Sequence, residues 1–238
     1  MRVIAPREVR LLLVLSAVLV TSAVVAELVA VKLFEVPFYG WLGWNKMFTL
    51  TCGSIVWPVV FLATDTINEF FGRPAVRFLT WVTMAMIAWT FVIASLSIPI
   101  PAVGFSPVSD AVFAAVFGQS KWIIVGSMAA FLASQIVDVT VFHWIRRALG
   151  GRHIWARATG STIVSQLIDS FVVIYIAFWW PGTVTAAVAL DISVSGFLYK
   201  VGLAVALTPL IYAAHYAVHA WLGHETADQL AHEAAANS

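Results

Sequence analysis

Charged residues are scarce in this chain of 238 residues: Asp, Glu, Lys and Arg make up only 11% of it, whereas 61% of the residues are hydrophobic. The mean hydropathy is correspondingly high, at +0.93. A water-soluble domain needs far more polar surface than this to cover its core. The composition therefore excludes an ordinary soluble domain and indicates a protein that spans a membrane.

Several sequence signatures are missing as well. The single cysteine, Cys52, excludes an intrachain disulfide framework and any metal site made of cysteines alone. The sequence has no basic face interleaved with aromatic residues, so nucleic-acid binding has no support. The patterns G-x-S-x-G, H-E-x-x-H and G-x-x-x-x-G-K-[ST] do not occur, which removes the usual signs of a hydrolase, a metalloprotease or a nucleotide site. We therefore expect no enzymatic activity and no cofactor.

Long apolar runs are abundant. Runs of about 20 mostly apolar residues are typical of transmembrane helices, and no alternating pattern suggests a barrel. Six such spans are predicted, and the last is long enough to tilt, to kink at Pro209 or to leave the bilayer. The predicted fold is an all-α, polytopic membrane protein with six transmembrane helices, at roughly 11–31, 48–65, 76–98, 122–145, 160–180 and 192–221.

The arginines predict the orientation of these spans, because cytoplasmic connections carry an excess of Arg and Lys. All nine arginines fall in the N-terminal tail or in the connections after the second and fourth spans, and the alternate connections hold only Lys32, Lys46 and Lys121. Both termini are therefore expected in the cytoplasm. Residues 1–222 form one transmembrane domain in this prediction, and 223–238 form a polar cytoplasmic tail. The tail is expected to be a short helix or disordered. His224, Asp228 and His232 recur at helical spacing in it, but a solvated tail is favoured over a metal site.

A short motif occurs twice, in two consecutive spans. The fourth span carries Ser134-Gln135-x-x-Asp138, and the fifth carries a second Ser-Gln-x-x-Asp, at Ser165, Gln166 and Asp169. Within each copy the three polar residues share one helix face. Polar groups inside a bundle are costly, so each is a candidate functional residue, the alternative being a helix-packing hydrogen bond.

The depth of these groups can be estimated from the helical rise of 1.5 Å per residue. Asp138 lies about 12 Å and Asp169 about 18 Å inside the cytoplasmic boundary, so the side chains of the two copies are expected to meet near mid-membrane. Lys200, about 14 Å deep in the sixth span, is the expected counter-charge, unless it snorkels to the outer interface. Asp138 or Asp169 is the expected partner of Lys200, and Glu27 is an alternative partner.

A third polar cluster ends the second span. Asp65, Asn68 and Glu69 lie within about one helical turn of one another, before Gly72-Arg73-Pro74 breaks the helix. One interpretation is that Glu69 pairs with Arg73, four residues on, and only stabilises the helix end. The other is that the cluster is a gate or a substrate contact on the cytoplasmic side.

Together these segments resemble the queuosine precursor transporter family, the YhhQ-like proteins of the vitamin uptake transporter group. The resemblance covers about three quarters of the chain, in the family order: "FLATDTINEFFGRPAVR" (61–77), "AVFAAVFGQS" (111–120), "ASQIVDVTVFHWIRR" (133–147), "STIVSQLIDSFVVIYIAF" (161–178) and "YKVGLAVALTPLIY" (199–212). It implies a six-helix inner-membrane importer of the 7-deazaguanine bases preQ0 and preQ1, which are used to make the tRNA base queuosine.

The residues fit such a substrate. A 7-deazaguanine presents adjacent N–H donors and a carbonyl acceptor on one edge, which carboxylate and amide side chains can pair. The expected substrate residues are therefore the two Ser-Gln-x-x-Asp sets, Lys200 and the 65–69 cluster. The flat faces call for aromatic neighbours, and four lie nearby in the sequence, most of them expected to face lipid or the core: Phe142, Trp144, Phe171 and Tyr175.

Other functions remain open at this point. The main alternative is the substrate-binding subunit of an ATP-driven vitamin importer, which would need a separate energising module. An intramembrane enzyme lacks a motif, and a purely structural subunit would not need buried Asp, Gln and Lys. A homodimer is compatible with so small a transporter, and the sequence does not decide between proton coupling and facilitated diffusion.

Overall fold

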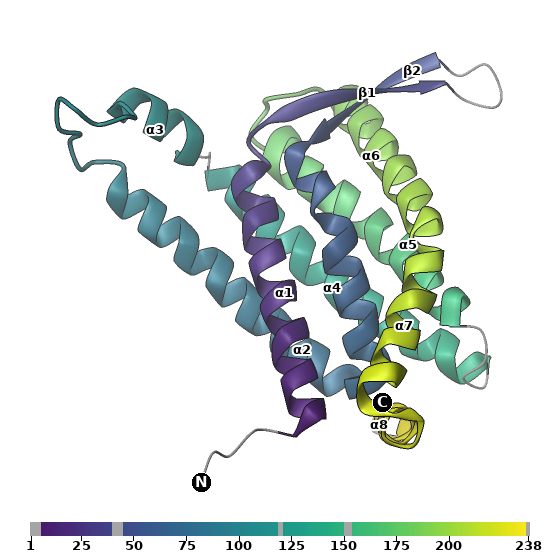
Figure 1. Cartoon of the computed structure of the whole chain (residues 1–238). Helices are drawn as coiled ribbons and strands as arrows, with labels where there is room; N and C mark the ends of the chain where they lie inside the picture. The colour runs from purple at the N-terminus through teal and green to yellow at the C-terminus, as the bar shows by residue number, and fades with distance from the viewer. Residues whose placement is uncertain (1–5, 40–44, 119–120, 150–153, 237–238) are drawn as a thin grey trace, which may run out of the picture.

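The computed structural model describes residues 6–39, 45–118, 121–149 and 154–236. Most of them form one bundle of helices (Figure 1), with a strand hairpin across one end. In chain order the elements are α1 (Arg7–Val29), β1 (Leu33–Tyr39), β2 (Asn45–Thr51), the 3-10 turn η1 (Cys52–Ile55), α2 (Trp57–Ser97), α3 (Asp110–Phe117), α4 (Lys121–Ala148), α5 (Ile154–Ile174), the π-helical turn η2 (Tyr175–Trp179), α6 (Ala186–Ala206), α7 (Thr208–Leu222) and α8 (His224–Ala236).

Five helical stretches of the described chain are long and apolar enough to cross a membrane. The longest, α2, has 41 residues, which at the helical rise is about 60 Å, twice the thickness of the hydrocarbon core. A single crossing cannot use that length, so α2 covers both the second and the third predicted spans. The protein is therefore a polytopic, multi-pass membrane protein of the all-α class.

Gly72 divides α2. Its backbone is non-helical, with φ 76° and ψ −179°, a region that only glycine adopts without strain. A Cβ at this position would also lie 3.1 Å from the carbonyl oxygen of Ala234 in α8. The predicted break before Pro74 is thus confirmed, and its position brings the C-terminal helix against the bend.

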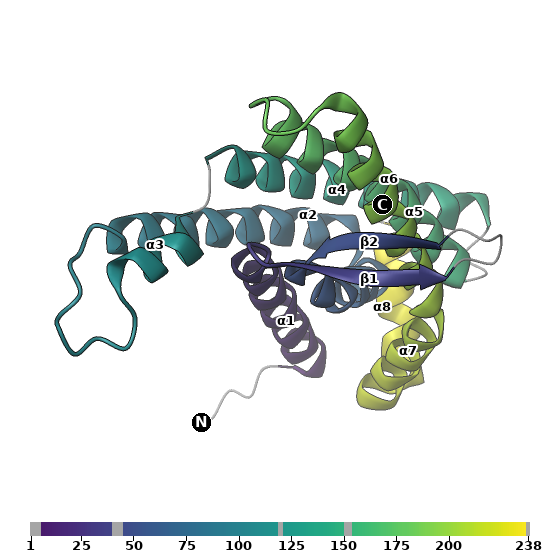
Figure 2. The same cartoon turned by 90° about the horizontal axis from the view of Figure 1, so that it is seen from above.

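The hairpin corrects the predicted second span, which was expected to begin at residue 48. Residues 48–51 belong to strand β2, which pairs antiparallel with β1 from Leu33↔Thr51 to Tyr39↔Asn45, and the helix begins only at Trp57. The two strands lie across the end of the bundle where α1 finishes (Figures 1 and 2). Runs rich in Phe, Val, Tyr and Thr on either side of a Gly-containing turn are a hairpin signal, which hydropathy alone concealed.

The long sixth span is two helices, α6 and α7, which meet at Leu207 just before Pro209. In Figure 1 they descend in sequence from the hairpin end, and α8 lies at the end where α1 begins. The two ends of the described chain therefore share one end of the bundle. Six crossings would produce this arrangement, although the span count and the cytoplasmic side stay predictions.

The C-terminal segment is a short helix, one of the two expected alternatives, and it is packed against the bundle. Residues 224–236 form the helix α8, which packs against α2 with Ala227 and Ala234 buried. Arg146 of α4 donates a hydrogen bond of 2.6 Å to the carbonyl oxygen of Ala231. The polar composition of this segment predicted an exposed tail. Ala227 and Ala234 lie seven residues apart, on one face of the helix, and this face packs against α2.

The largest apolar core joins α1, α2 and α4. Its members are buried side chains, most of them on the faces of α1 and α2 that pack together. The core holds the helices that carry the polar groups described below, and comprises Leu19, Ala23, Val60, Ala63, Ile67, Val76, Leu79, Ile87, Phe91, Phe131 and Val139.

Candidate transport site

The two copies of the Ser-Gln-x-x-Asp motif face each other. Helices α4 and α5 run antiparallel and are the most extensively packed pair of helices in the described chain. All six motif residues are buried, each with at most 7% of its surface exposed. The connection between the two helices is short. Residues at similar distances from it on α4 and on α5 therefore lie opposite each other. The predicted meeting of the two motifs is confirmed.

A cavity with an empty volume of about 290 Å³ lies between them. We call it the glutamine cavity, because Gln135 and Gln166 both line it, as predicted. The Oε1 atom of Gln166 and the hydroxyl of Thr64, which also lines the cavity, are buried without a hydrogen-bond partner in the described structure. Buried polar atoms normally find partners, so these two are available to a bound polar molecule or to water.

Asp138 also lines the glutamine cavity. Ser165 of the facing helix donates to its Oδ1 at 3.1 Å, and Ser161, one turn away, hydrogen-bonds the same carboxylate. Hydroxyl donors stabilise and orient a buried carboxylate while leaving further lone pairs for a ligand. Ser134 completes the polar wall, and its hydroxyl donates to the backbone carbonyl of Phe131 at 3.0 Å.

The aromatic walls of this cavity are not the ones expected. Trp57, Phe61 and Phe131 line it, and the Trp57 ring lies 5.8 Å from Phe61 and 6.1 Å from Phe131, centroid to centroid. The four aromatic residues expected from sequence proximity are absent from its lining, and one of them, Trp144, is 69% exposed on the outside of the bundle. Sequence proximity could not find Trp57 and Phe61, because both come from α2, far away in sequence.

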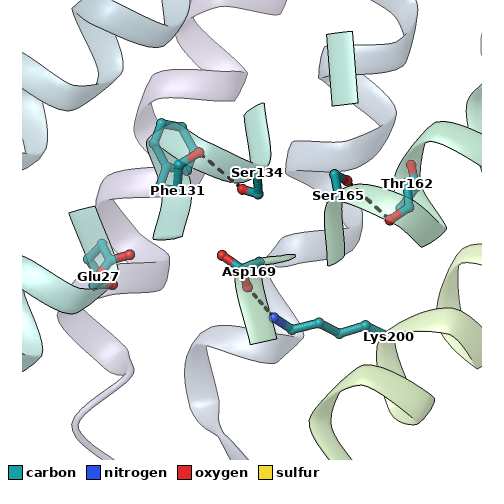
Figure 3. A network of polar contacts seen from close by, with 8 residues as sticks. Glu27, Phe131, Ser134, Thr162, Ser165, Asp169 and Lys200 are labelled. Atoms are coloured by element: carbon teal, nitrogen blue, oxygen red, sulfur yellow. Dashed lines mark hydrogen bonds and ion pairs between the residues drawn. The ribbon is translucent and has the colours of Figure 1, made fainter. Parts of the chain in front are cut away.

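Asp169 has a different environment from Asp138. It forms an ion pair with Lys200 of α6 (Figure 3), which confirms the expected carboxylate partner and excludes snorkelling. Glu27, near the end of α1, interacts electrostatically with both residues and accepts a hydrogen bond from Ser127 of α4. We call Glu27, Asp169, Lys200 and Ser127 the charge cluster. None of the four lines the glutamine cavity.

The third predicted cluster lies on α2, buried in the bundle. Asp65, Asn68 and Glu69 are 6%, 0% and 7% exposed, and neither side-chain amide atom of Asn68 has a hydrogen-bond partner in the described structure. Asp65 and Glu69 line a cavity of about 270 Å³ together with His215 of α7, which we call the histidine cavity. The pairing of Glu69 with Arg73 stays a prediction.

A third space, the threonine cavity, lies between the other two. It has an empty volume of about 250 Å³ and is lined by Thr159 and Thr162 of α5. It shares Phe61 and Thr162 with the glutamine cavity, and Asp65 and Ile211 with the histidine cavity. The three cavities therefore lie next to one another in a row from the two glutamines toward the end of the bundle that α8 covers.

The groups that line this row can hydrogen-bond to, and stack on, a small polar molecule. The walls offer carboxylates, amides, hydroxyls and aromatic rings. In the described residues no group of three His, Cys, Asp or Glu side chains converges to hold a metal. Each cavity has room for only about one water molecule, so a bicyclic ligand requires the helices to separate.

The chain resembles known proteins over most of its length. A family model described as "Putative vitamin uptake transporter" matches residues 51–214, which include all three polar clusters except Glu27. The chain belongs to this transporter family. It is therefore a transporter and not an enzyme. No solved structure matches it significantly.

The chain is also similar to three curated proteins of known sequence. The chain is 35% identical over 168 residues to the "Probable queuosine precursor transporter" of Bacillus subtilis (strain 168), covering 70% of this chain and 72% of that protein. It is 30% identical over 156 residues to the "Queuosine precursor transporter" of Escherichia coli (strain K12), with coverages of 65% and 67%. A third relative, from Haemophilus influenzae, is 31% identical over 135 residues, covering 56% of this chain and 53% of its own.

Proposed function

We propose that this protein imports the 7-deazaguanine queuosine precursors preQ0 and preQ1 across the inner membrane into the cytoplasm. The observation that carries the proposal is the glutamine cavity, where two amides and a carboxylate from facing helices surround one space. The names of the relatives, all queuosine precursor transporters, support the same substrate class.

The cavity matches the edges and faces of a deazaguanine. The Asp138 carboxylate can accept from two adjacent N–H groups of the base, and a glutamine amide can donate to its carbonyl and accept from its ring N–H. Trp57 and Phe61 can stack on the flat faces. A base held in this way satisfies the unpaired Gln166 and Thr64 atoms.

The row of cavities supports a path toward the cytoplasm. The histidine cavity also contains carboxylate acceptors, from Asp65 and Glu69, and Asn68 lies beside them on α2. A base leaving the glutamine cavity would pass Thr162 and then reach this second set of acceptors. In this proposal both termini lie in the cytoplasm, as the distribution of arginines favours, and the oligomeric state is a monomer or a homodimer.

The proposal is tested by uptake of radiolabelled preQ0, preQ1 and guanine into cells that lack their own precursor transporter and express this chain alone. Uptake of a deazaguanine in preference to guanine is expected. The alternative, a substrate-binding subunit of an ATP-driven importer, predicts binding by the purified chain but no uptake until an energising module is supplied. If the chain neither binds nor transports these bases, the proposed substrate is wrong.

Variants of the two glutamines test the site itself. Gln135→Leu and Gln166→Leu each leave one edge of the base unpaired, which should cost about 1–3 kcal/mol, or roughly ten- to hundredfold in affinity. Gln229→Leu is the matched control, because Gln229 lies exposed on α8 and bonds only Glu233 among the described contacts. Unchanged affinity in both cavity variants would remove the glutamines from the site.

A further inference from the structure

The wall of the glutamine cavity carries one negative charge. Asp138 is the one charged side chain among the described residues that line this cavity, and its carboxylate accepts hydrogen bonds from the hydroxyls of Ser161 and Ser165. Lys200, the cation bound by the second copy of the motif, pairs with Asp169 and lies outside this lining. A carboxylate buried in a membrane bundle needs a counter-charge, and none of the described residues of the cavity wall supplies one.

The hydrogen-bonding groups of this wall are mostly acceptors. The Ser134 hydroxyl donates its proton to the carbonyl oxygen of Phe131 (Figure 3). The Ser165 hydroxyl donates to the neighbouring carboxylate or to the carbonyl oxygen of Thr162. Both hydroxyls therefore offer lone pairs, and no proton, to a ligand. The buried Oε1 atom of Gln166, without a partner in the described structure, is a further acceptor, so a ligand rich in N–H donors fits this wall.

Helix α2 supplies the facing wall. Trp57, Phe61 and Thr64 lie four and three residues apart on one helix face, and all three line the cavity. The face of an aromatic ring attracts a cation placed over it. The Thr64 hydroxyl is buried without a hydrogen-bond partner in the described structure, whereas Thr66 and Thr80 of the same helix donate to the backbone carbonyl four residues earlier. The oxygen of Thr64 is therefore open to an N–H donor beside the rings.

One substituent distinguishes the two proposed substrates. PreQ1 carries an aminomethyl group, a primary amine that is protonated at neutral pH as a lysine side chain is, and preQ0 carries a neutral nitrile in the same place. An ammonium group brings a positive charge and three N–H donors, whereas a nitrile brings one acceptor and no charge. A wall with a carboxylate, several acceptors and ring faces is complementary to the ammonium group and not to the nitrile.

We propose that the glutamine cavity selects a 7-deazaguanine that carries a primary ammonium group, as preQ1 does, over neutral bases of the same shape. The Asp138 carboxylate accepts from the N–H edge of the base, the Trp57 ring stacks on its face, and the ammonium group lies against Phe61 and Thr64. The opposite charges need not touch, because Coulomb attraction falls only with the inverse of distance and is strong where water is excluded. This inference rests on the proposed function, since it concerns which member of that substrate class binds.

The test compares three ligands on the purified full-length protein in lipid nanodiscs. The dissociation constants of preQ1, preQ0 and 7-hydroxymethyl-7-deazaguanine are each measured by isothermal titration calorimetry at neutral pH. The hydroxymethyl compound matches preQ1 in size and shape but carries no charge. For the wild type we expect preQ1 to bind about tenfold or more tightly than either neutral base, because only preQ1 brings the counter-charge of the buried carboxylate.

Variants assign this preference to the cavity wall, with the ratio of the dissociation constants of the hydroxymethyl compound and preQ1 as the readout. Asp138→Asn should bring the ratio to within about threefold of one, because the charge is lost. Phe61→Leu and Thr64→Val should each lower it about threefold or more, through a lost ring face and a lost acceptor. Thr80→Val is the matched control: Thr80 is buried on α2 but is not among the described residues that line the three cavities, so the ratio should stay at the wild-type value.

Each result decides a different statement. A neutral base that binds the wild type as tightly as preQ1 overturns the inference and leaves the proposed function intact. A ratio that survives Asp138→Asn, or that is lost instead in Asp65→Asn of the neighbouring cavities, also overturns it. If Asp138→Asn does not fold, an unchanged ratio in both Phe61→Leu and Thr64→Val overturns it in the same way. Binding of none of the three bases by the wild type refutes the proposed substrate class, which is a separate failure.

Discussion

Replacing Lys200 by Met should destabilise the protein, because it removes the partner of a buried carboxylate. Breaking a buried ion pair costs about 3–5 kcal/mol. The two side chains keep 13% and 9% exposure, so we expect the lower end of that range, about 3 kcal/mol. At about 2–4 °C per kcal/mol for a chain of this length, the melting temperature should fall by on the order of 10 °C.

A second set of variants distinguishes the loss of the ion pair from the general effect of replacing a side chain. Combining Lys200→Met with Asp169→Asn removes both charges, so the double variant should recover part of the stability lost in Lys200→Met. Lys32→Met, at an exposed position beyond α1, controls for the substitution itself. Thermal unfolding of the purified protein, followed by size-exclusion fluorescence, compares these three variants and the single variant Asp169→Asn in one detergent.

Two outcomes would refute the reasoning. The ion pair does not stabilise the bundle if the melting temperatures of Lys200→Met and Lys32→Met differ by less than about 2 °C, which is at most about 1 kcal/mol for a chain of this length. If the effects of Lys200→Met and Asp169→Asn simply add in the double variant, the two residues are not coupled. A double variant that is stable but inactive in uptake assigns the pair a role in transport.

Two further predictions concern the bend in α2 and the aromatic wall. Gly72→Ala should lower stability by about 1–2 kcal/mol, because its φ of 76° disfavours a side chain; Gly202→Ala, where a Cβ meets nothing within 4 Å, should not, and thermal unfolding compares them. Trp57→Ala should weaken base binding by about 1–3 kcal/mol through lost stacking, whereas Trp144→Ala, on the exposed face, should leave the affinity measured by equilibrium binding unchanged.

The class of the protein and its polar inventory follow from the sequence alone. Hydropathy indicates a membrane bundle because apolar runs of this length have no other stable environment. Helical periodicity puts Ser, Gln and Asp of each motif on one face, since residues three and four apart are neighbours on any α-helix. The depth of Lys200 in the membrane predicts that a carboxylate lies next to it, and the segment Gly72-Arg73-Pro74 predicts that a helix ends there. These are local or one-dimensional properties.

Only the tertiary structure decided which groups meet. Asp169 rather than Asp138 holds Lys200, and Asp138 instead lines the glutamine cavity, although the two acids occupy equivalent motif positions. The reason is physical: the rotation and tilt of one helix against another depend on the packing of all the side chains between them. The same holds for Trp57 in the cavity wall and for Ser127 on Glu27, 100 residues apart in sequence. Hydropathy and helical spacing carry no information about contacts between such distant segments.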